Sequence, residues 1–218
     1  MSHMTHKTLA KECQLSGIGI HSGSPVTLYF KPSLRGHIRF IHSETNHELI
    51  VSPSVTHNDH NRATKLTNNH LTISTPEHLL SACAALQLSS LDIVVTNSEI
   101  PICDGSAQPF LDLFISTGLK LIETLDNDPI CIKEPITIHD GEACIIATPA
   151  ESSYFSYYLT YDHHLLGTQS YTLSLTPESY KTDIAPARTY GFESEVAYLK
   201  AQGLAKGGSL DNALVIGK

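Results

Sequence analysis

The sequence predicts an α+β protein of two domains, in which strands come first and helices later. Three observations predict this class. Period-two or β-branched segments open each half of the chain, and amphipathic segments follow them. Between the halves, residues 125–129 (Leu-Asp-Asn-Asp-Pro) are polar, rich in turn formers and closed by proline. We therefore expect a first domain over residues 7–125 and a second over 129–218.

The strands of the first half are predicted by apolar alternation and by runs of β-branched residues. They are expected at residues 15–21, 26–30, 37–41, 71–73 and 91–95. Gly17 and Gly19 in the first of them indicate a close approach of another backbone. The strand at 37–41 is expected to pair with the strand at 26–30.

Two helices are predicted in the same half. The first covers residues 76–86, with Thr75 as N-cap and Pro76 at the first helical position. The second covers 110–119 and is closed by Gly118.

Strands resume after residue 129 and precede one more helix. Strands are expected at residues 130–132, 136–139, 143–147, 155–161, 171–175 and 213–216. Asp140-Gly141 is a hairpin turn between the second and third of these. A helix is expected over 193–201. The halves thus begin alike, and two related domains are possible.

Composition excludes several classes of protein. The chain has 218 residues, a formal net charge of −8 and 41% hydrophobic residues, so it can bury a core and is a poor candidate for nucleic-acid binding. No segment is long and apolar enough to span a membrane, and no signal-peptide pattern opens the chain, so we expect a cytoplasmic protein. Residues 1–4 resemble a vector remnant. The five cysteines contain no Cys-x-x-Cys pair and are expected as reduced thiols.

The segment 73–80 (Ile-Ser-Thr-Pro-Glu-His-Leu-Leu) places a carboxylate and an imidazole in the first turn of a helix. The helix dipole favours an ionised Glu77, which could act as general base on a metal-bound water, with His78 as a metal ligand. The alternative is that Glu77 forms a capping box with Ser74 and that His78 is a surface residue.

Two further segments could carry chemistry. Residues 99–107 (Glu-Ile-Pro-Ile-Cys-Asp-Gly-Ser-Ala) follow a buried strand, although they could equally be a strand-to-helix turn with Ser106 as N-cap. In residues 187–192, Thr189 could donate to an oxyanion and Arg188 could bind a phosphate, or the segment could be an ordinary strand edge. Gly207-Gly208 would allow a ligand to approach closely.

Taken together and in this order, five motifs resemble one known family. They are Gly-Ile-Gly-Ile-His-Ser-Gly at 17–23, Ser-Thr-x-Glu-His-Leu at 74–79, Glu-Ile-Pro-Ile-x-Asp-Gly-Ser-Ala-x-Pro-Phe at 99–110, Ala-Arg-Thr-Tyr-Gly-Phe at 187–192, and Gly-Gly-Ser-x-Asp-Asn-Ala-Leu-Val at 207–215. The chain is similar to UDP-3-O-acyl-N-acetylglucosamine deacetylases from about Lys7 to its last residue.

This resemblance implies a fold and a reaction. It implies two similar α+β domains, each a sheet layer on a helix layer, with a zinc site between them. It also implies an insert in the second domain, here about 193–215, that forms a passage for an acyl chain. The apolar residues of this insert would suit such a passage or a packed helix face. The reaction would be zinc-dependent hydrolysis of the 2-acetamido group of the UDP-linked acylated amino sugar in lipid A biosynthesis, releasing acetate.

The resemblance also assigns roles to residues. Glu77 matches the general base, His78 a zinc ligand, and Thr189 the hydroxyl that binds the oxyanion. The residues expected near the substrate are His21, Asp104, Tyr190 and Gly208.

One feature of the family is not found in this sequence. The family draws two further zinc ligands from a helical His-Lys-x-x-Asp motif, and no Asp here has a His four residues before it. We therefore expect an incomplete second domain, and a 218-residue chain that by itself has one zinc ligand and is inactive. The alternative is a non-catalytic protein that binds nucleotide-sugar or acyl ligands.

Overall fold

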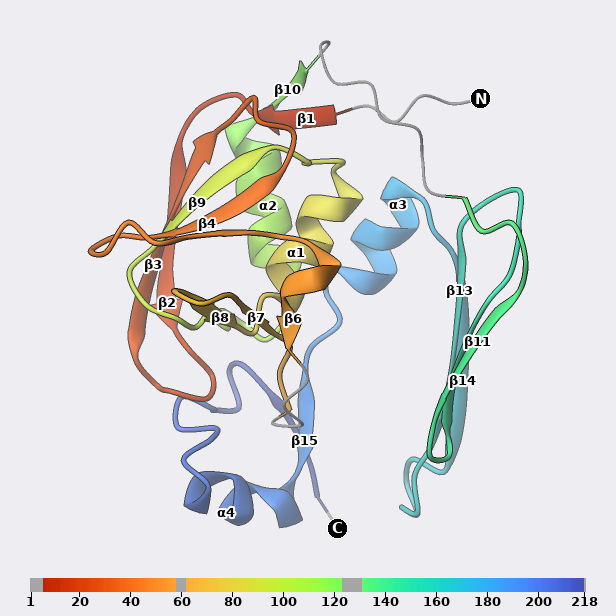
Figure 1. The fold of residues 1–218 in the computed structure, drawn as a ribbon. Coiled ribbons are helices and arrows are strands. Elements are labelled where there is room, and N and C mark those ends of the chain that lie inside the picture. The colour runs from red at the N-terminus through yellow and green to blue at the C-terminus, as the bar shows by residue number, and fades with distance from the viewer. Residues whose placement is uncertain (1–5, 58–61, 123–130, 218) are drawn as a thin grey trace. The chain divides into compact units, whose positions relative to one another are not determined.

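The computed structural model describes residues 6–57, 62–122 and 131–217, and within these ranges the protein is α+β, with several sheets and four α-helices (Figure 1). The predicted fold class is therefore confirmed at this level. The chain divides into two compact units, one comprising residues 6–122 with 181–217 and the other residues 131–180. The predicted boundary at 125–129 lies outside the described residues. The two similar domains stay a prediction.

A five-stranded sheet forms the centre of the larger unit, in the order β2-β3-β9-β4-β5. Its strands are β2 (Cys13–Ile18), β3 (Pro25–Pro32), β4 (Ile38–His42), β5 (Glu48–Ile50) and β9 (Leu91–Val95). The expected pairing of the 37–41 strand with the 26–30 strand is wrong, because β9 lies between β3 and β4 and runs parallel to β4. This central place suits β9, since Leu91, Ile93 and Val95 are all fully buried.

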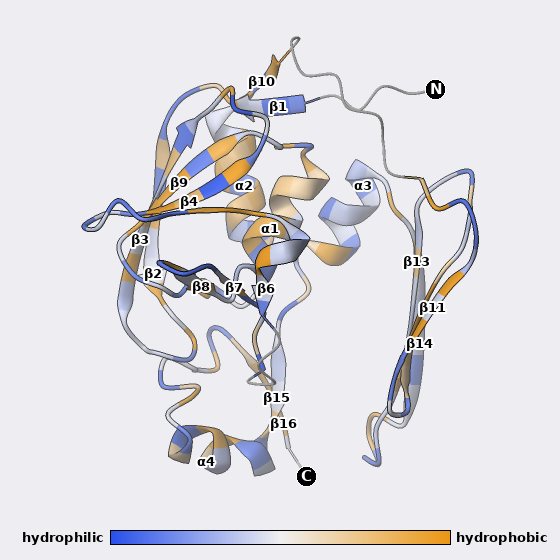
Figure 2. Cartoon of the chain, viewed as in Figure 1, coloured by the Kyte–Doolittle hydropathy of each residue, from blue (hydrophilic) through white to orange (hydrophobic). Residues whose placement is uncertain are grey.

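Helices α1 (Glu77–Ala85) and α2 (Gln108–Thr117) supply the other half of the core. Figure 2 shows apolar residues along both helices, and Leu79, Phe110 and Phe114 are fully buried. The ring of Phe114 meets that of Phe30 in β3 edge to face, with centroids 5.0 Å apart. The helices therefore pack against the sheet through one apolar layer.

The starts of both helices differ from the predictions. Thr75 does not cap α1, since it has a φ of +55° and its hydroxyl donates to the carbonyls of Ser74 and Ile100. Nor does Ser106 cap α2, whose N-cap is Ala107. Gly118 does end α2, with a φ of +86°. At α1 the contacts of Thr75 with neighbouring segments thus replace local capping. The Ser106 hydroxyl makes local contacts only, since it donates to Asp104 and accepts from the N–H of Gln108, the first residue of α2.

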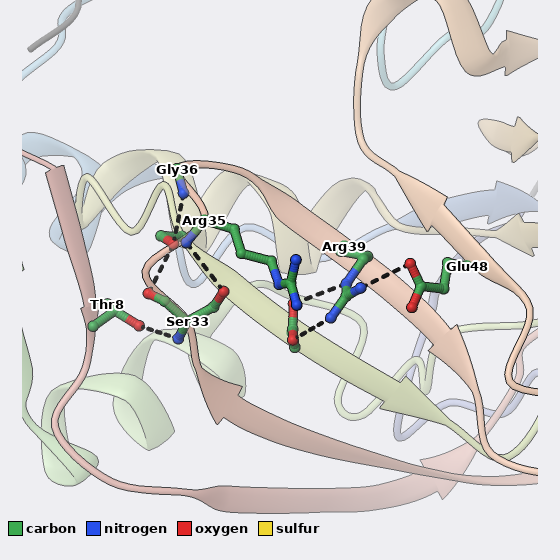
Figure 3. A network of polar contacts seen from close by, with 8 residues as sticks. Thr8, Ser33, Arg35, Gly36, Arg39 and Glu48 are labelled. Atoms are coloured by element: carbon green, nitrogen blue, oxygen red, sulfur yellow. Dashed lines mark hydrogen bonds and ion pairs between the residues drawn. The ribbon is translucent and has the colours of Figure 1, made fainter. Parts of the chain in front are cut away.

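A polar network crosses the sheet beside this core (Figure 3). The buried Arg39 of β4 binds Asp92 of β9 through two hydrogen bonds of 3.0 and 2.5 Å and Glu48 of β5 at 2.7 Å. The paired carboxylates raise the pKa of Arg39, so the guanidinium stays charged. The network joins three neighbouring strands, and breaking it would leave a buried charge unpaired.

Smaller elements complete the larger unit. They are β1 (His6–Leu9) paired with β10 (Leu119–Ile122), the 3-10 helix η1 (Pro53–Val55), the sheet β6 (Thr56–His57), β7 (Lys65–Thr67) and β8 (Thr72–Ser74), the π-helix η2 (Tyr180–Ile184), the parallel pair β15 (Tyr190–Phe192) and β16 (Leu214–Ile216), and α4 (Glu193–Ala201). The bounds of α4 are those predicted. The predicted strand at 213–216 is confirmed as β16.

The smaller unit contains two hairpins. They are formed by β11 (Ile136–Asp140) with β12 (Ala143–Ala147) and by β13 (Tyr154–Thr160) with β14 (Thr168–Ser174), and α3 (Pro177–Ser179) follows them. The predicted hairpin is confirmed, but its turn is shifted by one residue from Asp140-Gly141, because Asp140 pairs with Ala143 and the two turn residues are Gly141, with a φ of +57°, and Glu142. Many apolar side chains of the hairpins are exposed, among them Ile145 at 73% and Tyr158 at 74%. No strand forms at the described residues of 130–132.

Candidate active site

A cavity of about 520 Å³ lies within the larger unit. Its walls come from the β2–β3 turn, the start of α1, the segment after β9, β15, α4 and the loop before β16. The apolar lining residues are Ile20, Ile100, Pro101, Ile102, Val196, Leu199, Ala205, Leu210, Ala213, Leu214 and Val215. The predicted site residues Glu77, His78, Thr189, His21, Tyr190 and Gly208 also line it. Six of the seven predicted residues are thus brought to one cavity, which is mostly apolar.

Glu77 is the first residue of α1, and its carboxylate faces a neighbouring segment. Its Oε1 accepts a hydrogen bond of 2.5 Å from the backbone N–H of Thr64, just before β7. The capping box with Ser74 that the sequence allowed is therefore absent. The bond from Thr64 fixes the orientation of the carboxylate. One oxygen is anchored and the other has no hydrogen bond within the described part of the chain.

His78 is half-buried beside Glu77. Burial lowers the pKa of His78, and the charges of Glu77 and Asp104 offset part of that effect. The imidazole is therefore mainly neutral at pH 7, with a ring nitrogen free of a proton. This form can bind a metal or accept a proton.

Three of the six described non-glycine residues with a left-handed backbone conformation line this cavity. Arg62, Thr75 and Ala205 line it, and all three have φ values between +51° and +58°, in the left-handed region. This conformation costs energy in residues other than glycine and is common at functional sites. The surrounding structure must therefore impose it.

Thr189 and Tyr190 reach the cavity at the start of β15. The N–H of Thr189 donates to the carbonyl of Gly105 at 2.8 Å, and its carbonyl accepts from the N–H of Leu214 at 2.9 Å. Thr189 is thereby fixed between the segment after β9 and β16. Arg188 does not face a phosphate site, because its guanidinium donates to the carbonyls of Asp104 and Leu210.

Asp104 is the predicted residue that does not line the cavity. Its Oδ1 accepts from the N–H and hydroxyl of Ser106 at 3.0 and 2.8 Å, forming a local turn before α2. Asp104 still acts on the site electrostatically, through its effect on the pKa of His78.

Glu99 organises the wall that carries His21, and the sequence pattern did not assign it a role. It is 5% exposed, and its two oxygens accept from the N–H groups of His21 at 2.7 Å and Ser22 at 2.8 Å. Gly19 lies against this carboxylate, because a Cβ there would come within 2.1 Å of Glu99 Oε2. The turn that presents His21 is thus built around one buried carboxylate.

The loop that carries Gly208 is held against the same turn. The N–H of Gly207 donates to the carbonyl of Ile20, and the N–H of Lys206 donates to the carbonyl of His21. A Cβ on Gly207 would lie 2.3 Å from the carbonyl oxygen of Gly19. The expected close approach of another backbone to this glycine-rich segment is therefore confirmed at Gly19.

A sequence model of the UDP-3-O-acyl N-acetylglycosamine deacetylase family matches residues 6–218. The chain belongs to this family. Its relatives include proteins named UDP-3-O-acyl-N-acetylglucosamine deacetylase from Syntrophotalea carbinolica, 38% identical over 97% of the chain and 69% of the relative, and from Thermosynechococcus vestitus, 37% identical over 97% and 74%. A relative of the same name from Nautilia profundicola is 36% identical over 98% and 73%. The members of the family are hydrolytic enzymes. No helix among the described residues is long and apolar enough to cross a membrane.

Zinc is the metal that the family resemblance implies. A neutral, half-buried His78 suits one zinc ligand. Within the described ranges, however, no group of three or more His, Cys, Asp or Glu side chains is arranged to hold a metal ion. A catalytic zinc takes three protein ligands, so the described residues do not form a complete site.

Proposed function

We propose that the protein catalyses removal of the 2-acetyl group from UDP-3-O-acyl-N-acetylglucosamine in lipid A biosynthesis, releasing acetate and a free amine. One observation carries the proposal. A carboxylate and a neutral imidazole from the start of α1 and a hydroxyl from the start of β15 line one cavity whose remaining wall is largely apolar. Polar reacting groups beside an apolar wall suit a substrate with an amide next to an acyl chain.

Glu77 is the general base in this proposal. Its Oε1 is held by the N–H of Thr64, which leaves Oε2 to take a proton from the attacking water. The fixed oxygen keeps the carboxylate from turning away from the cavity.

Thr189 would donate its hydroxyl to the oxygen of the tetrahedral intermediate. Its backbone is held on both sides by hydrogen bonds, so the hydroxyl needs little reorganisation when the charge develops. His21, Tyr190 and Gly208 would contact the sugar and the nucleotide, and Asp104 would act through His78.

Zinc is the proposed cofactor, with His78 as one ligand. When bound, zinc would polarise the amide carbonyl and lower the pKa of a bound water. We further propose that the 218 residues assayed alone hydrolyse the substrate negligibly, since a catalytic site takes three protein ligands and the described residues contain no such group.

The test compares the protein expressed from the complete reading frame of its gene with the 218-residue chain. Acetate release from UDP-3-O-acyl-N-acetylglucosamine is measured with added zinc, with and without a chelator. We expect chelator-sensitive turnover by the first protein and substrate binding without turnover by the second. Binding without turnover by both proteins would instead favour the alternative, a non-catalytic binder, which the apolar cavity would also suit.

A further inference from the structure

Helix α4 forms one wall of the cavity but is weakly anchored. None of its residues is buried, and no side chain caps its first turn. Its cavity-facing residues are Glu195, Val196, Leu199 and Lys200. A short helix with little buried surface has little intrinsic stability. The position of this wall must therefore depend on contacts outside the helix.

One ion pair joins α4 to the opposite part of the cavity lining. Arg62 Nη2 lies 2.6 Å from Glu195 Oε1, and the two residues are 133 positions apart in the chain. The side chain of Arg62 is 57% exposed and that of Glu195 is 30% exposed. The second oxygen, Glu195 Oε2, is buried and has no donor in the described part of the chain. Within the described part of the chain, the Glu195 carboxylate is therefore held in this place by Arg62.

Arg62 is itself held by the structure near the proposed base. It has a left-handed φ of +58° and lies two residues before Thr64, whose N–H binds Glu77. The short segment 62–64 thus contacts both α4 and the first residue of α1. A displacement of α4 could therefore shift the Thr64 N–H that holds the Glu77 carboxylate.

We propose that Arg62 and Glu195 are positioning residues whose ion pair holds α4 against the cavity and so sets the place of Val196 and Leu199. The expected effect on ligand binding rests on the proposed function, because an acyl chain is the group that would pack on these side chains. The positioning of α4 by the Arg62–Glu195 ion pair, called the tether below, does not depend on that function. Arg62 could instead bind the diphosphate of a nucleotide sugar directly, but its short contact with a half-buried carboxylate favours the tether.

Hydrogen exchange of the 218-residue protein tests the tether without activity. We expect Arg62→Gln and Glu195→Gln each to speed amide exchange in α4 about two- to fivefold, as loss of a partly exposed ion pair would. The charge-exchanged double variant Arg62→Glu/Glu195→Arg should restore protection. Raising the salt to 1 M should speed exchange in the wild type but not in Arg62→Gln/Glu195→Gln. Glu193→Gln, an exposed acid of the same helix, is the matched control. Unchanged exchange in α2 shows that each variant is folded.

Ligand binding separates the two roles of Arg62. With UDP-3-O-acyl-N-acetylglucosamine the single variants should bind about two- to fivefold more weakly, and with UDP-N-acetylglucosamine they should bind as the wild type does. Equal weakening with both ligands, without rescue by the exchanged pair, would show an anion site and overturn the proposal. The proposal would also be overturned if the amide exchange rates in α4 were the same in Glu195→Gln and Glu193→Gln. Failure to bind either ligand would count against the proposed function, while the exchange data still decide on the tether.

Discussion

Replacement of Glu77 by Gln in the protein from the complete reading frame should lower kcat strongly while leaving the fold intact. The Gln side chain can place its Oε1 where the carboxylate Oε1 now accepts from the Thr64 N–H. Its Nε2 then takes the place of Oε2, and an amide nitrogen cannot accept a proton from water. The local hydrogen bond is kept and the basic oxygen is lost.

The size of the effect follows from this loss alone. General-base catalysis contributes about a hundred- to ten-thousand-fold, so kcat should fall by that factor, which corresponds to about 3 to 5 kcal/mol of barrier. KM should change little, because the size and hydrogen bonding of residue 77 are preserved.

Steady-state kinetics on each variant, with its zinc content and thermal unfolding measured, make up the assay. Glu44→Gln, an exposed acid in the β4–β5 turn, is the control for loss of one negative charge. His78→Ala should instead lose zinc, so the zinc content distinguishes the role of a metal ligand from that of the general base. A Glu77→Gln protein with bound zinc and near-normal kcat would refute the assignment, and Glu77 would then be only the residue that receives the Thr64 N–H.

Three other outcomes can be checked in the 218-residue chain. Glu99→Gln should lower the free energy of unfolding by about 1.5–3 kcal/mol, because an amide cannot accept from both His21 and Ser22, and a melting temperature lowered by less than 1 °C would contradict this. Burial lowers the folded-state pKa of His78, so the stability that this residue contributes is present above the unfolded pKa of about 6.5 and is lost as the pH falls. Urea unfolding from pH 8 to 5 should therefore show a steeper fall in the free energy of unfolding for the wild type than for His78→Gln. An equal dependence on pH in the two proteins would refute this prediction. Burial raises the pKa of Cys83 to about 12, so iodoacetamide at pH 8 should label it far more slowly than the exposed Cys144, with mass spectrometry as the readout.

Periodicity in the sequence located the elements that are long or strongly patterned. The strand at 91–95, the strand at 143–147 and the helix at 193–201 have the predicted bounds. It did not locate β1, β5, β6, β7, β10 and β15, which have two to four residues. So few residues show no period, and such strands form only because a distant partner supplies their hydrogen bonds, as β10 does for β1.

The candidate site was predictable in residue type but not in arrangement. Glu77, His78 and Thr189 stand out because acidic, imidazole and hydroxyl side chains occur in motifs shared with a family. The functions inferred for Arg62 and Glu195 have no local signal, since their partnership joins positions 133 residues apart. The cap expected at Thr75 was wrong for the same reason, because its hydroxyl donates to the carbonyl of Ile100, 25 residues further along the chain.

The motif glycines explain how these distant segments form one cavity. A Cβ on Gly105 would lie 2.2 Å from the carbonyl oxygen of Asn212, and one on Gly207 would lie 2.3 Å from that of Gly19. Both are points where one backbone crosses another without room for a side chain. The crossing at Gly105 also provides the carbonyl that receives the N–H of Thr189. The backbone crossings therefore set the distances within the cavity, and the side chains that line it add the chemistry at positions already fixed.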